Sequence, residues 1–181
     1  MNWHIPKDLT FEDALQLTRT LTEAMVNKKL KDSEIEEIVT TLVNSENGAR
    51  GFFVVYLTSD LPLADNPSEG VVNALKTSPE IVSELLVKNL AMSSAMSVTH
   101  RRNNDENMAK SSEKVAVRNG NLIKLTDLEL SSQKLAALTQ TIINNSGIYQ
   151  AFLDKWEYDE EQNIQIFDIL VEGGEQVLEE G

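Results

Sequence analysis

The sequence predicts an all-α protein, built as a single-domain helical bundle of about six to eight helices. Helix breakers are few, because the 181 residues include only 8 glycines and 4 prolines. Most segments between these breakers repeat apolar residues every three or four positions, which is the helical period. Only residues 49–58 have the aromatic and β-branched content of a strand. A lone strand needs a partner, and the chain offers no convincing second one.

The first helices are predicted from their N-terminal signals. Residues 1–9 read as an extended lead-in, after which Thr10 with Asp13 gives an N-cap and an acidic first turn. Ser33 with Glu36 has the spacing of a capping box at the start of the next helix. The apolar stripe of that helix has the spacing of one buried face; its members are Ile35, Ile38, Val39, Leu42 and Val43.

Residues 33–58 and 133–157 match in register and predict two helical hairpins that are pseudo-equivalent. Three positions, each 100 residues apart, are identical: Thr41 and Thr141, Asn44 and Asn144, Phe52 and Phe152. Two unrelated hairpins would often look this alike, so duplication and chance similarity both stay open. The second copy, "GIYQAFLDKW", reads as helix, and residues 49–58 are therefore predicted to be helix rather than strand.

A long central helix is predicted over residues 79–102, with the two hairpins packed around it. Asn66 and Pro67 give the N-cap and first position of a short helix before it. The long segment is apolar over an arc too wide for a surface helix, which is typical of a central one.

The C-terminal third has weaker signals. Asn119-Gly120-Asn121 predicts a turn, leaving helix only near 109–118. Two hairpin arms follow, at about 127–146 and 148–157. The last helix is predicted to begin at Asp159, with Gln162 completing a capping box, and to end at Gly173-Gly174. Residues 173–181 then form an acidic tail that is expected to fray.

Composition excludes several functions. The net charge is −13, and residues 159–181 carry eight acids and no base, which disfavours binding to nucleic acid or to an anionic membrane. Cysteine is absent, so disulfides and thiolate chemistry are excluded. No apolar run approaches the roughly 18 residues of a membrane span, and no signal-peptide pattern is present. A cytoplasmic protein is the expectation.

Motifs of catalysis are missing. The chain has no G-x-S-x-G, no phosphate-binding glycine loop, no Glu-x-x-His pair and no EF-hand spacing. We therefore predict no catalytic residue, no metal site and no cofactor.

His100, Arg101 and Arg102 form the most polar cluster and have three interpretations. They complement the C-terminal dipole of the long helix, with Asn103 or Asn104 as its left-handed cap. Alternatively, they form ion pairs with the acidic C-terminal helix. As a third possibility they bind an anion or an acidic partner, with help from Arg118.

A strip of small residues with two methionines lies on the long helix, and its members of interest are Ala91, Met92, Ala95 and Met96. Small residues allow close helix approach, and methionine makes an adaptable surface. The strip either packs inside the protomer or contacts a partner helix, including that of a second copy.

The function predicted first is a non-enzymatic α-helical interaction or adaptor module that binds a protein partner or forms a homodimer. The alternatives are a domain that binds a small anionic ligand through His100, Arg101 and Arg102, and an enzyme whose acid and base carboxylates the sequence does not single out.

Overall fold

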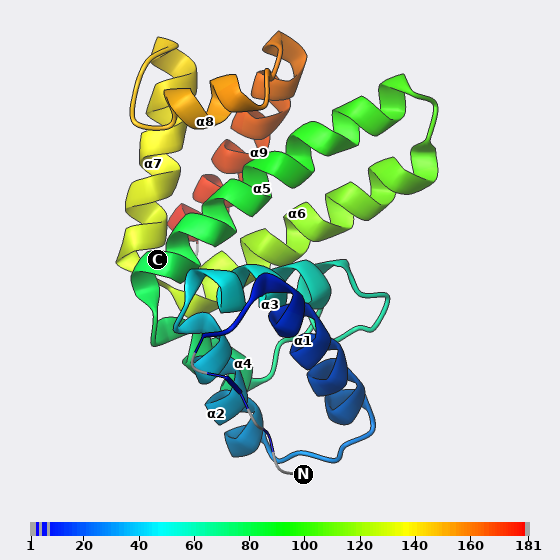
Figure 1. Cartoon of the computed structure of the whole chain (residues 1–181). Helices are drawn as coiled ribbons and strands as arrows, with labels where there is room; N and C mark the ends of the chain where they lie inside the picture. Colours follow the sequence, from blue (N-terminus) through cyan, green and yellow to red (C-terminus); the bar gives the residue numbers. More distant parts are fainter. Residues whose placement is uncertain (1–2, 4, 7, 180–181) are drawn as a thin grey trace. The chain divides into compact units, whose positions relative to one another are not determined.

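The chain folds into α-helices throughout the part that the structure describes. A computed structural model describes residues 3, 5–6 and 8–179, with side chains up to Glu172. Nine helices and no strand are present in these residues (Figure 1). The helices are α1 Phe11–Val26, α2 Asp32–Val43, α3 Glu46–Thr58, α4 Glu69–Lys76, α5 Pro79–Arg102, α6 Glu106–Thr126, α7 Glu129–Asn144, α8 Gln150–Lys155 and α9 Glu160–Glu179. The all-α prediction is confirmed, and so is helix over residues 49–58.

Contacts divide the chain into two compact units. Unit 1 is Met1–Leu85 and unit 2 is Leu86–Gly181, so the boundary falls inside α5. The long helix itself was predicted with the bounds that it has. The single-domain arrangement, with both hairpins packed around this helix, stays a prediction.

Unit 1 is held together by close packing of α3 on α1 and of α2 on α4. Phe52, Phe53 and Tyr56 of α3 are fully buried, with the Phe52 ring stacked on Tyr56 at 4.9 Å between centroids. A Cβ added at Gly51 would lie 2.4 Å from the Cβ of Ala14, so glycine is what allows α3 to approach α1 this closely.

Unit 2 has a core of its own, drawn from five helices and the loop before α8. Three of its members from α5 and α6 are alanines, and larger side chains from α7 to α9 complete it. The core consists of Val87, Leu90, Ala91, Ala95, Ala116, Leu138, Tyr149, Leu153, Ile166 and Leu170.

Two predicted N-caps are confirmed and two are wrong. The Thr10 hydroxyl accepts from the N–H of Asp13, as predicted. The capping box at the start of α9 is present in both directions, and its geometry is described with the site. The α2 helix begins earlier than expected, with the Lys31 N–H donating to Glu34 in place of a Ser33 box. The α4 helix is capped by Ser68 and not by Asn66.

The predicted turn at residues 119–121 is wrong, because α6 continues through it to Thr126. Asn119 is fully buried there, and its side-chain N–H donates to the carbonyl of Val115 at 2.9 Å. Leu122 on the next turn is also fully buried. Packing of this face outweighs the local turn preference of Asn-Gly.

Two further expectations about the C-terminal region are corrected. Gly173 and Gly174 do not end α9, which continues to Glu179. In the second hairpin α8 has 6 residues against 13 in α3, and a five-residue loop separates it from α7. The duplication of the two hairpins therefore stays a prediction.

The α5 helix is long and apolar enough to cross a membrane by length and composition, with a mean hydropathy of 1.2 over its best window. Core helices of soluble proteins meet the same criteria, and 61% of that window is buried within the protein. It is the one helix of this kind in the part of the chain that the structure describes.

Candidate functional site

The cluster at residues 100–105 ends α5 in a Schellman motif. Asn104 adopts a left-handed conformation with φ of 57°, as expected for a C-terminal cap. Its N–H donates to the carbonyl of Arg101 at 2.9 Å, and the N–H of Asp105 donates to the carbonyl of His100 at 2.9 Å. The predicted helix-end interpretation of His100, Arg101 and Arg102 therefore accounts for the backbone of this segment.

Arg102 forms ion pairs with two acids at the start of α9. Its Nη1 lies 2.5 Å from one carboxylate oxygen of Asp159, and its Nη2 donates to the other at 3.0 Å. Its Nε donates to Glu161 at 2.9 Å. This bidentate hydrogen bond, together with the N–H of Gln162, lowers the pKa of Asp159 to about 2.

Arg101 is also paired inside unit 2, while Arg118 is buried. The guanidinium of Arg101 binds Glu113 of α6, and Glu106 lies 3.9 Å from its Nε. Arg118 is almost fully buried within α6 and engaged inside the protein, so it does not present a cation beside His100 at the surface. Internal acids thus already partner Arg101 and Arg102, and the anion-binding interpretation gains no support from this geometry.

Replacing Arg102 with glutamine is expected to lower the melting temperature at pH 6 more than at pH 2. The folded pKa of Asp159 lies below its ordinary 3.8, so its ionisation stabilises the fold above pH 3.8. That stabilisation is lost as the pH falls through the folded value of about 2. Thermal melts of wild type and Arg102→Gln between pH 6 and pH 2 measure the difference.

Lys110→Gln removes the same charge from an exposed position of α6 and is the matched control. The effect of Arg102→Gln should also shrink at high salt, since both partners are exposed. An unchanged difference between the two variants from pH 6 to pH 2 would show that Asp159 does not stabilise the fold through Arg102.

The small-residue strip of α5 packs mainly inside unit 2. Ala91 and Ala95 are fully buried members of its core, so they are not available to a partner, which corrects that part of the interface hypothesis. The nearby Ser94 is also buried, and its hydroxyl donates to the carbonyl of Leu90 at 2.7 Å. Met96 is 39% exposed and Met92 is half-buried, so an interface role for these two stays a prediction.

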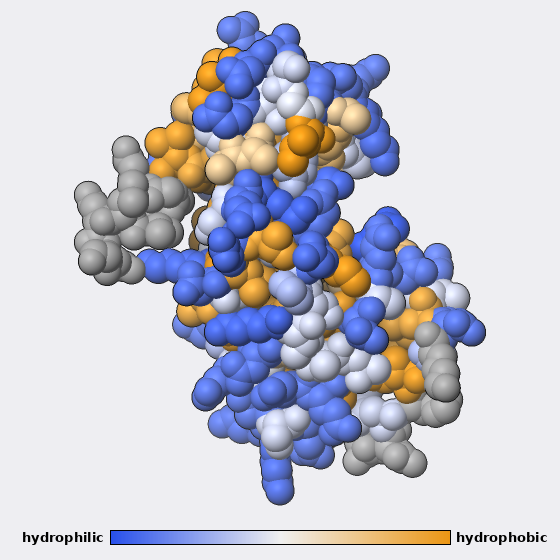
Figure 2. Space-filling model, turned by 90° about the vertical axis from the view of Figure 1, so that its left-hand side faces the viewer, coloured by the Kyte–Doolittle hydropathy of each residue, from blue (hydrophilic) through white to orange (hydrophobic). Residues whose placement is uncertain are grey.

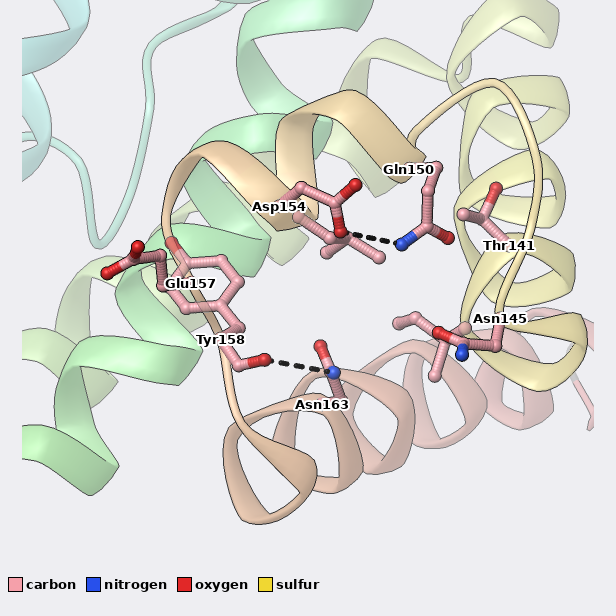
Figure 3. Close-up of a pocket in the computed structure, with 9 residues that line it drawn as sticks. Thr141, Asn145, Gln150, Asp154, Glu157, Tyr158 and Asn163 are labelled. Atoms are coloured by element: carbon pink, nitrogen blue, oxygen red, sulfur yellow. Dashed lines mark hydrogen bonds between the residues drawn. The ribbon is translucent and has the colours of Figure 1, made fainter.

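A polar pocket of about 280 Å³ lies between α7, α8 and α9 of unit 2 (Figure 3). Short loops position it. Asn145, directly after α7, and Glu157, two residues after α8, adopt left-handed conformations that turn the chain back. The lining residues are Thr141, Ile142, Asn145, Gln150, Leu153, Asp154, Glu157, Tyr158 and Asn163.

Three of the seven labelled side chains of the pocket are amides. Figure 3 shows the amides of Gln150, Asn145 and Asn163 around one space, while the carboxylate of Glu157 points away from it. The Gln150 side-chain N–H donates to Asp154 at 2.8 Å, and that of Asn163 donates to the carbonyl of Tyr158 at 3.4 Å. The amide oxygens of Gln150 and Asn163 are buried and have no hydrogen-bond partner within the described residues.

The titratable groups that line the pocket are those of Asp154, Glu157 and Tyr158. Burial raises the pKa of Tyr158 to about 12, so its phenol stays neutral at physiological pH. In the described part of the chain, no cluster of three or more His, Asp or Glu side chains is arranged to hold a metal ion. The pocket brings one carboxylate, Asp154, beside three amides.

Residues 10–172 match the family described as Uncharacterised conserved protein UCP020893. The chain belongs to this family. The matched range begins at the N-cap of α1 and ends within α9, so it includes both units and the whole pocket. No match was found among the curated proteins, and none among the solved structures.

Sequence reasoning missed the pocket, because its residues resemble turn formers. Asn145 follows a helix and precedes Ser146 and Gly147, a composition that predicts a loop. Gln150 and Asn163 lie 13 residues apart and face one another only because α8 folds back between α7 and α9. The acids at residues 154 and 157 were a signal that the sequence offered, because both lie among the residues that line the pocket.

Proposed function

We propose that this protein is an α-helical interaction module that binds a protein partner through the α7–α8–α9 end of unit 2. The proposal rests on apolar side chains exposed on these adjoining elements. Ile148, in the loop between α7 and α8, is 79% exposed, Ile143 is 57% exposed and Ile164 is 52% exposed. We call these three residues the isoleucine patch.

Two members of the isoleucine patch adjoin residues of the pocket in the sequence. Ile143 follows a pocket residue of α7, and Ile164 follows a pocket residue of α9. Exposed apolar groups that gather on neighbouring elements are typical of a contact surface, whereas scattered ones need no explanation. Figure 2 shows hydrophobic groups exposed among hydrophilic ones on one face of the molecule.

Charge around the isoleucine patch favours a basic partner over a second copy of this chain. Residues 154–161 contain five acids and one lysine, and the Nζ of Lys155 lies over the ring of Trp156 at 5.5 Å from its centroid. A second acidic copy would bring like charges together across a symmetric contact. The partner is therefore expected to carry an apolar patch rimmed with lysine and arginine.

Ile143→Asp/Ile148→Asp is expected to abolish binding of a partner that the wild type retains. Capture from a cell extract on immobilised protein, compared between the variant and wild type, measures this, and the retained partner should be released by salt. Val117→Asp is the matched control, because Val117 is 68% exposed on α6 outside the isoleucine patch. The control should bind as the wild type does.

Light scattering of the same proteins tests whether the partner is a second copy of this chain. If the wild type is a dimer and the variant is a monomer, the interaction function stands and the partner is a second copy of this chain. The proposal would be wrong if the wild type is monomeric at all concentrations and the variant retains every protein that the wild type retains.

A further inference from the structure

We propose that the pocket between α7, α8 and α9 binds a small organic cation through a primary ammonium group. This inference is independent of the isoleucine patch. It rests on the hydrogen-bonding state of two amides whose oxygens are buried, on the charge beside them and on the size of the pocket.

The orientation of both amides is fixed by the groups that their nitrogens contact. Rotating the Gln150 amide would place its oxygen against the carboxylate of Asp154, and rotating Asn163 would place oxygen against the Tyr158 carbonyl. Either rotation sets two acceptors against one another, so the atoms without partners are acceptors. A buried acceptor without a donor is costly, and a ligand that enters this pocket gains most if it brings N–H groups.

Among ligands that carry N–H groups, the negative charge of the pocket and of the whole chain favours a cation. Asp154 is the acid of the pocket whose carboxylate lies beside the amides, as its contact with Gln150 shows. Lys155, the neighbouring base, has its Nζ over the ring of Trp156. The whole chain carries −13, which attracts cations and repels anions. An ammonium group has three donors, which match the two amide oxygens and the carboxylate.

The volume limits the ligand to a short molecule. At about 280 Å³ the pocket lies just below the roughly 300–1,000 Å³ of pockets that hold drug-sized ligands. Ile142 and Leu153 are its apolar lining residues and would contact a short alkyl chain. A diamine of four carbons fits this description, and 1,4-diaminobutane is the probe that we choose.

Titration calorimetry of the full chain with 1,4-diaminobutane, at about 150 mM salt to screen non-specific attraction, is expected to show saturable binding. The neutral isostere 1,4-butanediol should give none. Asp154→Asn and Asn163→Leu should each weaken binding of the diamine about tenfold or more, since the first removes the negative charge beside the ammonium group and the second removes one of its acceptors. Asp60→Asn removes the same charge from an exposed loop of unit 1 and should bind as the wild type does.

Two results would overturn the proposal. No binding of 1,4-diaminobutane to the wild type would mean that water satisfies the two amide oxygens. Equal binding by wild type, Asp154→Asn and Asp60→Asn would mean attraction to the acidic surface as a whole. Thermal melts verify that the variants are folded, and if Asn163→Leu is not, the comparison of Asp154→Asn with Asp60→Asn decides.

Discussion

Replacing Phe52 with alanine should lower the free energy of unfolding by about 3–5 kcal/mol. The side chain is fully buried in unit 1, stacked on Tyr56 and in edge contact with Phe53 at 5.5 Å. Alanine would leave a cavity that the surrounding helices close only in part, so the lost contacts add to the lost burial. Urea unfolding followed by circular dichroism measures the change.

Val54→Ala in the same helix is the matched control. Val54 is almost half exposed, and alanine is the better helix former, so its free energy of unfolding should change by about 0.5 kcal/mol or less. Similar losses in the two variants would mean that the α3 face carrying Phe52 is not the packed face of unit 1.

Gly51→Ala is expected to destabilise the protein by about 1–3 kcal/mol, although alanine favours helix. Its methyl group would lie 2.4 Å from the Cβ of Ala14 and 3.0 Å from backbone atoms of α1. Neither helix backbone can yield without shifting the whole contact between α1 and α3. Denaturant midpoints of wild type and variant give the difference.

Gly120→Ala provides the opposite case within α6. Nothing lies within 4 Å of an added methyl group there, so the substitution should stabilise the protein by about 0.5–1 kcal/mol. Comparing Gly51→Ala with Gly120→Ala distinguishes the effect of helix propensity from that of close packing, because the chemical change is the same at both positions. A gain in stability at both glycines would contradict the tight contact of Gly51 with Ala14.

Much of the helical structure follows from signals that lie close together in sequence. The α5 helix was predicted to the residue, because Ser78-Pro79 marks its start and Asn103-Asn104 its end. Few glycines and prolines, together with apolar residues at helical spacing, were sufficient to predict the fold class.

Predictions failed where distant packing decides the local conformation. Asn119-Gly120 is a turn signal by itself, yet α6 passes through it because Asn119 and Leu122 face the core. The same limit applies to the pocket, whose amides are separated along the chain and are oriented by contacts that no local pattern encodes. The ion pairs of Arg102 were one of three interpretations, and choosing among them required the position of α9.

The hydrogen bonds of the Gln162 side chain affect the order in which the parts of unit 2 fold. Its side-chain oxygen accepts from the N–H of Asp159 at 3.1 Å, while its nitrogen donates to Thr99 at 3.0 Å and to the carbonyl of Ala95 at 3.4 Å. The Asp159 side chain in turn accepts from the backbone N–H of Gln162 at 3.1 Å.

One amide thus caps α9 and fixes it to a helix 63 or more residues earlier in the chain. Closing so long a loop costs entropy before any contact repays it. The first turn of α9 is therefore expected to become ordered only after α6 and α7 have brought it back to α5. In this protein, an ordered start of the last helix is therefore expected only when the rest of its unit has assembled.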